Sequence, residues 1–306
     1  MTKHQATGTR PAWVDDELFP FESRFVELHG NVVHYVDEGS GPILLMLHGN
    51  PVWSFVYREV IAVLRDRFRC IALDLPGFGL STGAPGYHYL AKDHAALIVS
   101  FLDRLDLSQL TLVGHNWGGP LGLYAAQQRP GKFERLILSN TWAWPLNGDL
   151  TSEVFSRGMG SPIGRALMNR FDLLVKYFIP SAHKRRKPSE AEMAHYREAM
   201  PTPERRRPST VLPGELVGAR EFFTDLAGQL GALEQLPTLI LWADADPIFT
   251  GKYRERWEAM FPNAITTVLH GVGHFLQSDA PEEFCEAIET WWAELAGDGS
   301  RRGPAT

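Results

Sequence analysis

The 306-residue chain contains only two cysteines, Cys70 in a strand-like run and Cys285 in a helix-like run. Two isolated cysteines form neither a disulfide framework nor a spaced metal site, so we expect two reduced thiols in the core. No apolar run reaches the length of a membrane span, and residues 1–11 lack the apolar core of a signal peptide. The sequence therefore predicts no membrane partner and a cytoplasmic location.

Strong charge of either sign is also missing. The net charge is −6, with 22% charged and 44% hydrophobic residues. This mild acidity argues against a nucleic-acid partner, and the composition is that of an ordinary globular protein. There is no internal repeat. The length suits one large domain that carries an insertion.

One short stretch organises the chain. The apolar run Leu110–Val113 breaks at Gly114-His115-Asn116-Trp117-Gly118-Gly119 and continues as a helical segment. A single residue between small residues, at a sharp turn from a strand into a helix, is typical of the nucleophile elbow of an α/β-hydrolase. That position ordinarily holds Ser, Cys or Asp. Here it holds Asn116, which is a neutral amide.

The surrounding pattern predicts an α/β-hydrolase fold, with a mostly parallel central sheet flanked by helices and an inserted helical cap. We expect a hairpin over 25–39 and further strands over 43–47, 70–73, 110–113, 135–139, 238–242 and 266–269. The core should comprise residues 20–141 and 235–296. The cap should comprise 142–234, where strand patterns are missing and prolines separate helical pieces. Residues 1–19 and 297–306 are expected to be disordered.

Two further polar residues follow strands in the order that this fold requires after its nucleophile. Asp246 follows an apolar strand and precedes a proline, and His274 lies in a glycine-flanked loop after the last strand. Ligands of open α/β sheets gather outside the carboxyl ends of the strands, where all three positions fall. The sequence therefore predicts a catalytic set of Asn116, His274 and Asp246, while His115 should point into the fold.

The motifs His48-Gly49-Asn50-Pro51 and Gly114–Gly119 resemble those of the haloalkane dehalogenases, and the resemblance extends from Phe21 to about Leu295. In that family the elbow Asp displaces halide from carbon, and water activated by the His hydrolyses the alkyl-enzyme ester. The resemblance assigns the oxyanion and halide site to Asn50 and Trp117. Asn140 occupies the place of the Glu found in another branch of the family, so the acid falls on Asp246. It implies no metal or cofactor, and it implies as partners a small apolar halogenated substrate, halide and water.

Aromatic residues near these motifs are candidate pocket walls. Trp142 and Trp144 enter the cap, and Phe249 and Phe275 follow the acid and the base. For each of them, packing in the core is the alternative. Epoxide hydrolases use two cap tyrosines, for which Tyr177 and Tyr196 are available, but the Asn50 motif fits that family less well.

Asn116 should block or greatly reduce dehalogenation, because an amide is a poor nucleophile. Three explanations of this residue stay open. It is a deliberate replacement of Asp, it belongs to a relative with a changed reaction, or the water activated by His274 hydrolyses the amide to Asp. A changed reaction would use His274 and Asp246 as acid and base for epoxide opening, cyclisation or elimination. A non-catalytic small-molecule binder is the remaining alternative.

Overall fold

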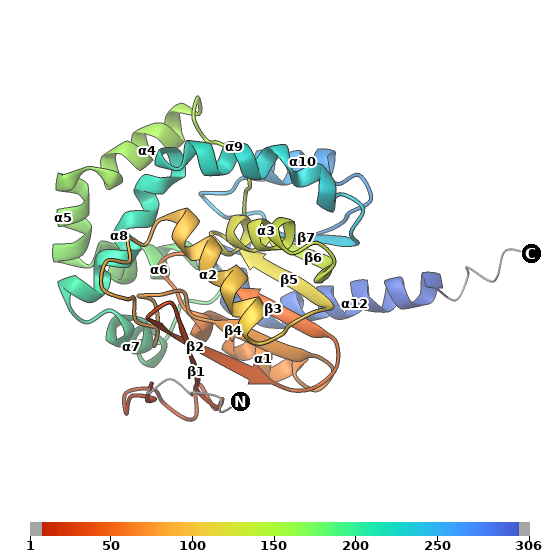
Figure 1. Cartoon of the computed structure of the whole chain (residues 1–306), viewed down its shortest axis with the longest axis horizontal. Helices are drawn as coiled ribbons and strands as arrows, with labels where there is room; N and C mark the ends of the chain where they lie inside the picture. Colours follow the sequence, from red (N-terminus) through yellow and green to blue (C-terminus); the bar gives the residue numbers. More distant parts are fainter. Residues whose placement is uncertain (1–7, 300–306) are drawn as a thin grey trace, which may run out of the picture.

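The structure is a computed structural model that describes residues 8–299. At its centre lies an eight-stranded sheet in the order β1-β2-β4-β3-β5-β6-β7-β8 (Figure 1). The strands are β1 Arg24–Leu28, β2 Asn31–Glu38, β3 Ile43–Leu47, β4 Arg69–Leu73, β5 Leu110–His115, β6 Phe133–Ser139, β7 Thr238–Ala243 and β8 Ile265–Leu269. Strands β3 to β8 pair in parallel, whereas β2 is antiparallel to both β1 and β4. The predicted α/β fold with a mostly parallel sheet is confirmed.

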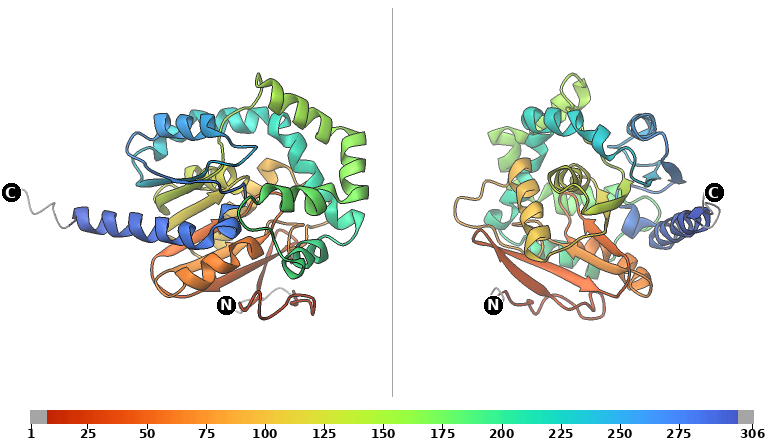
Figure 2. Two further views of the ribbon diagram at one scale, coloured as in Figure 1. Left: turned by 180° about the vertical axis from the view of Figure 1, so that it is seen from behind. Right: turned by 45° about the vertical axis from the view of Figure 1, so that its right-hand side comes forward.

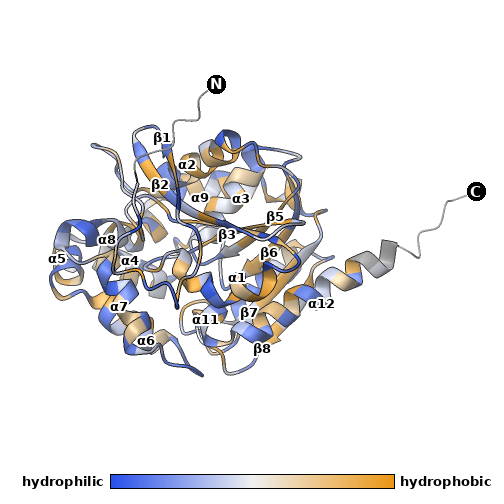
Figure 3. Cartoon of the chain, turned by 90° about the horizontal axis from the view of Figure 1, so that it is seen from below, coloured by the Kyte–Doolittle hydropathy of each residue, from blue (hydrophilic) through white to orange (hydrophobic). Residues whose placement is uncertain are grey.

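Helices cover both faces of this sheet. Helices α2 Ala91–Arg104 and α3 Gly118–Gln128 pack together on one face, and α1 Arg58–Leu64 and α12 Pro281–Gly299 pack together on the other (Figures 1 and 2). Three short elements complete this part of the chain, namely η1 Ser54–Tyr57, α10 Gly251–Met260 and α11 Leu276–Asp279. Hydrophilic and hydrophobic residues alternate along α12 (Figure 3), as expected for a helix with one face on the core.

The segment between β6 and β7 contains only helices among its regular elements. They are α4 Leu150–Gly160, α5 Pro162–Phe171, η2 Leu174–Phe178, α6 Ile179–Ala182, α7 Glu190–Ala199, α8 Pro203–Gly218, α9 Arg220–Gly228 and η3 Leu230–Leu233. Local sequence explains where several of them begin. For example, the Ser189 hydroxyl caps α7 while the Glu192 carboxylate accepts the Ser189 N–H, which satisfies two otherwise free donors.

The central strands are buried on both faces, which explains their continuous apolar runs. Every residue of β5 and β7 is buried, as are four of the five residues of β3. Cys70 and Cys285 are both buried and free, which agrees with the expected reduced thiols. None of the helices within residues 8–299 is long and apolar enough to cross a membrane.

The expected disorder of the chain ends is wrong where the structure describes them. In residues 8–19, Val14 and Phe19 are buried in the core, and the Arg10 guanidinium donates to the Phe19 carbonyl at 2.7 Å. At the other end, α12 continues through residues 297–299. Apolar residues later in the chain cover residues 8–19, and α12 extends further than expected at the other end. Residues 1–7 and 300–306 lie outside the described part.

Candidate active site

The turn between β5 and α3 places Asn116 at its tip. Asn116 has a φ of 52°, in the left-handed region that non-glycine residues seldom adopt. The neighbouring glycines are required by close approach, because a Cβ on Gly118 would lie 2.0 Å from the Leu47 carbonyl oxygen. One on Gly114 would lie 2.8 Å from the Gly119 Cα. The elbow inferred from the sequence is therefore present as a strained turn at the carboxyl end of β5.

Asn116, His274 and Asp246 lie in one hydrogen-bonded row. Asn116 Nδ2 is 3.1 Å from His274 Nε2, and His274 Nδ1 is 2.7 Å from Asp246 Oδ2. The side chains of His274 and Asp246 are completely buried. Since an amide nitrogen only donates, His274 Nε2 accepts, and Nδ1 carries the proton that is donated to Asp246. This is the tautomer in which a histidine presents a basic lone pair to the residue at the elbow.

The amide oxygen of Asn116 faces two backbone donors. Its Oδ1 accepts from the Trp117 N–H at 2.8 Å and from the Asn50 N–H at 3.1 Å. Trp117 also opens α3, whose N-terminus favours negative charge. Reversing the amide would place its NH₂ against these two N–H groups and its oxygen against the lone pair of His274. Both contacts would be repulsive, so the observed orientation is fixed by its partners.

Two residues outside the predicted set hydrogen-bond to Asp246 and His274. Asn140 donates from Nδ2 to Asp246 Oδ2 at 2.9 Å and to the Ala243 carbonyl at 3.0 Å. His115 Nε2 lies 2.8 Å from the carbonyl oxygen of His274 and donates to it. Burial holds the pKa of His115 well below its ordinary value, so this imidazole is neutral. His115 points inward as predicted, and Asn140 holds the Asp246 carboxylate in place.

Asp279 is a positioning residue that the sequence analysis did not identify. Its carboxylate accepts N–H bonds from Gly273 at 2.7 Å and from Lys184 at 2.9 Å, and from the two residues that follow Lys184. The pKa of Asp279 is lowered because these N–H bonds outweigh its burial. The His274 N–H in turn donates to the Ala182 carbonyl at 2.9 Å. The loop that carries His274 is thus held by the segment 182–186.

The predicted halide site is only partly available. The Asn50 side chain donates from Nδ2 to the Ser209 carbonyl of α8 at 3.0 Å, which leaves its second amide hydrogen for another acceptor. The Trp117 ring meets the Trp142 ring edge-on at 4.9 Å between centroids. The described contacts therefore place both predicted anion donors beside the elbow, under α8 and the start of the cap.

The four candidate wall aromatics separate into different environments. Trp142 stacks on Phe249 at 5.2 Å, and Phe249 stacks on His274 at 5.8 Å, so these two border the row. Phe275 is fully buried and meets the edge of the His274 ring at 4.9 Å. Trp144 instead packs against Trp257 at 5.0 Å and lies beneath a guanidinium. The packing alternative describes Trp144 better than a pocket wall does.

The candidate tyrosines do not converge on the row. The side chain of Tyr177 is 65% exposed, and Tyr196 is buried against Phe55, its hydroxyl lacking a hydrogen-bond partner among the described residues. Burial raises the pKa of Tyr196 to about 12. Epoxide opening would need two phenol donors that converge on the site, and Tyr177 and Tyr196 do not provide them.

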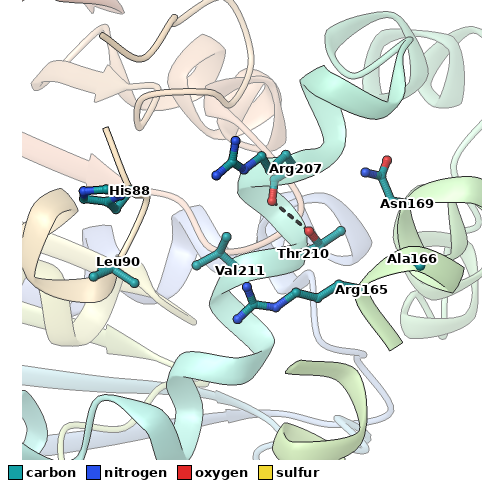
Figure 4. Close-up of a pocket in the computed structure, with 8 residues that line it drawn as sticks. All are labelled: His88, Leu90, Arg165, Ala166, Asn169, Arg207, Thr210 and Val211. Atoms are coloured by element: carbon teal, nitrogen blue, oxygen red, sulfur yellow. Dashed lines mark hydrogen bonds between the residues drawn. The ribbon is translucent and has the colours of Figure 1, made fainter. Parts of the chain in front are cut away.

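A separate pocket of about 420 Å³ lies between α5, α8 and the loop before α2 (Figure 4). Arg165 and Arg207 extend into it, and Thr210 Oγ1 donates to the Arg207 carbonyl at 2.8 Å. Its lining contains no member of the Asn116–His274–Asp246 row. Within residues 8–299 no three His, Cys, Asp or Glu side chains are grouped to hold a metal.

The fold and the site match a known class of enzymes. The family model for the α/β-hydrolase fold matches residues 42–281, which is most of the chain. The strand–turn–helix elbow, followed along the chain by an acid and then a histidine, has the order typical of that class.

The similarity to individual proteins is more specific. Haloalkane dehalogenase 2 of Mycobacterium tuberculosis is 41% identical over 276 residues, which cover 90% of this chain and 96% of that protein. A solved haloalkane dehalogenase structure from Bradyrhizobium elkani gives a TM-score of 0.82 at 26% identity, covering 91% of this chain and 99% of that one. The chain therefore belongs to the haloalkane dehalogenase family of α/β-hydrolases. A cis-3-alkyl-4-alkyloxetan-2-one decarboxylase of Shewanella oneidensis is also similar, at 29% identity over 95% of this chain and 94% of that protein.

Proposed function

We propose that this chain is a hydrolase of small apolar haloalkanes in which position 116 carries the nucleophile, and that Asn116 blocks the first step. The observation that carries the proposal is the unbroken row from Asn116 through His274 to Asp246 at distances of 3.1 and 2.7 Å. A carboxylate at position 116 would attack the halogenated carbon and form an ester. Water activated at His274 Nε2 would then hydrolyse this ester.

The same neighbours serve both steps. The N–H groups of Asn50 and Trp117, which hold the Asn116 oxygen, would stabilise the oxyanion formed during ester hydrolysis. The second amide hydrogen of Asn50 and the Trp117 indole N–H would bind the departing halide, because both are donors that carry no basic lone pair. The stacked rings of Trp142 and Phe249 would provide an apolar wall.

An amide at position 116 removes the displacement step. Its oxygen is neutral and shares its lone pairs with two N–H groups, so it is a weak nucleophile toward carbon. Loss of a member of a catalytic triad typically lowers the rate by about 10⁴-fold or more. The Asn form should therefore release halide slowly or not at all, while its binding site for substrate stays intact.

The test compares halide release from short bromoalkanes by this chain and by an Asn116→Asp variant, with an oxetan-2-one decarboxylation assay in parallel. Release by the Asn116→Asp variant alone supports the proposal. If neither form releases halide while the Asn116→Asp variant decarboxylates the oxetan-2-one, decarboxylation replaces dehalogenation as the proposed reaction. Bromide or iodide quenching of tryptophan fluorescence checks the anion site in the Asn form. If there is neither turnover nor quenching, a non-catalytic binder becomes the better description. A cytoplasmic location remains a prediction.

A further inference from the structure

We propose that the site hydrolyses the side-chain amide of Asn116 itself, so that the chain converts this residue to aspartate. The inference rests on the proposed role of His274 as a base, but it needs no haloalkane. Its substrate is the Asn116 amide carbon, and its only co-reactant is water. The arrangement around that carbon supplies what amide hydrolysis requires.

The carbonyl of this amide is already polarised. When water attacks the amide carbon, negative charge develops on Oδ1, and that atom lies 2.8 Å from the Trp117 N and 3.1 Å from the Asn50 N. Both donors are backbone groups that need no rearrangement, and preorganised donors of this kind stabilise a tetrahedral intermediate. Asn116 keeps 7% of its surface exposed, so the residue is not completely sealed from water.

The leaving group faces the only histidine in the row. Hydrolysis of an amide, unlike that of an ester, requires a proton on the departing nitrogen, and Asn116 Nδ2 lies 3.1 Å from His274 Nε2. His274 first exchanges this contact for a water molecule and takes one of its protons as the water oxygen bonds to the amide carbon. The imidazolium, held by Asp246 at 2.7 Å, then returns that proton to Nδ2.

The bonds and charges balance. The tetrahedral intermediate collapses by re-forming the C=O bond and breaking the C–N bond, which releases ammonia. The new carboxylic acid loses its proton, and the overall products are aspartate at position 116 and ammonium. No oxidant, reductant or metal takes part in the sequence.

The chain offers two matched controls. The Asn140 amide is also buried and fully hydrogen-bonded, but its partners are Asp246 and the two backbone groups of Ala243, so no imidazole faces its nitrogen and only one backbone N–H holds its oxygen. It should stay an amide. His270 and Asp244 form a second His–Asp pair at 2.8 Å, with the His270 side chain 82% exposed and its ring bonded to Asp244 rather than to Asn116. His270→Gln should therefore leave the rate unchanged.

The experiment follows freshly synthesised protein in heavy-oxygen water by intact mass and peptide mapping. We expect one amide-to-acid change, with one heavy oxygen in the side chain of residue 116 and none at Asn140. His274→Gln should slow the change by about 10²–10⁴-fold, the typical contribution of a general acid–base. Circular dichroism and thermal melting establish that this variant is folded. If position 116 is already an acid at the first time point, an intact amide in His274→Gln supports the same conclusion.

Two results would overturn the inference. One is an unchanged mass at position 116. The other is conversion at equal rates in the parent and His274→Gln, with isoaspartate among the products, because that pattern indicates backbone attack by the Trp117 nitrogen through a cyclic imide. Halide release by Asn116→Asp is measured separately, so the proposed function can stand while self-hydrolysis fails, and the reverse.

Discussion

Removing the base from a chain with a restored nucleophile should separate the two chemical steps. In the double variant Asn116→Asp/His274→Gln, the carboxylate and the two proposed halide donors, the Asn50 side-chain amide and the Trp117 indole N–H, remain in place. Displacement of halide uses these groups and does not need His274. Ester hydrolysis uses His274, whose Nε2 lies 3.1 Å from the side chain of residue 116 and whose Nδ1 is held at 2.7 Å by Asp246.

The expected size of the effect follows from that single contact. Among residues 8–299, His274 is the one base hydrogen-bonded to the side chain of residue 116, so its loss should slow hydrolysis by the roughly 10²–10⁴-fold typical of a general base. This corresponds to ~3–5 kcal/mol in the barrier. The double variant should release about one equivalent of halide per protein and then nearly stop, while the single variant Asn116→Asp turns over continuously.

The assay combines rapid halide detection with intact mass. We expect the double variant to accumulate protein heavier by the alkyl group, with the adduct on the peptide that contains residue 116. A steady rate equal to that of Asn116→Asp would refute the role of His274 as base. No first equivalent of halide in the double variant, with full turnover in Asn116→Asp, would show that His274 is needed already for displacement.

Three further outcomes are expected. Glu192→Met should lower the free energy of unfolding by about 3–5 kcal/mol, because it leaves the buried Arg58 guanidinium with only the longer ion pair to Glu59 at 3.4 Å. The double variant Arg58→Met/Glu192→Met should cost less in urea titrations, and equal costs would contradict this. Burial lowers the pKa of His183 from 6.5 to about 4. The unfolded chain therefore takes up a proton that the folded chain refuses, and stability should fall from pH 6.5 to about 4 by at most ~3 kcal/mol for this group, less steeply in His183→Gln. Trp117→Phe should weaken iodide binding, measured by fluorescence quenching, by about tenfold or more, since a hydrogen bond to a charged group contributes ~1.5–3 kcal/mol; unchanged binding would exclude the indole as a donor.

Local pattern explains why the fold was predictable. The runs Ile43–Leu47 and Thr238–Ala243 are continuous and apolar because both faces of each strand are covered, and such runs are visible in the sequence. The elbow was equally visible, because a Cβ on Gly114 would lie 2.8 Å from the Gly119 Cα within the same turn, which excludes a side chain there. Structural constraints that act between residues close together in the chain can be recognised in the sequence.

Contacts between distant residues left no such signature. Asp279 binds three consecutive N–H groups beginning at Lys184, more than ninety positions earlier in the chain, and a lone carboxylate at the end of the short helix α11 does not reveal this. His183 is likewise buried against Ser278, which lies 95 positions later in the chain. Phe19 was assigned to a disordered end because the aromatic cluster that covers it, including Trp53, comes later in sequence.

The surroundings of Asn116 satisfy the hydrogen bonds of a neutral amide. A site that had merely lost its carboxylate would leave some of these groups without partners. An amide has one acceptor end and one donor end, and here the acceptor end meets two N–H groups while the donor end meets the lone pair of His274. A carboxylate in the same position would satisfy the two N–H groups but would set its second oxygen against that lone pair. Only a proton, a water molecule or a substrate between them relieves that contact. The resting hydrogen bonds are therefore more complete with Asn116, whereas Asn116→Asp would set two acceptors against each other. The same nitrogen atom gives Asn116 its complementary hydrogen bonds and deprives it of nucleophilic reactivity, so hydrolysis of that one C–N bond would exchange hydrogen-bond complementarity for reactivity.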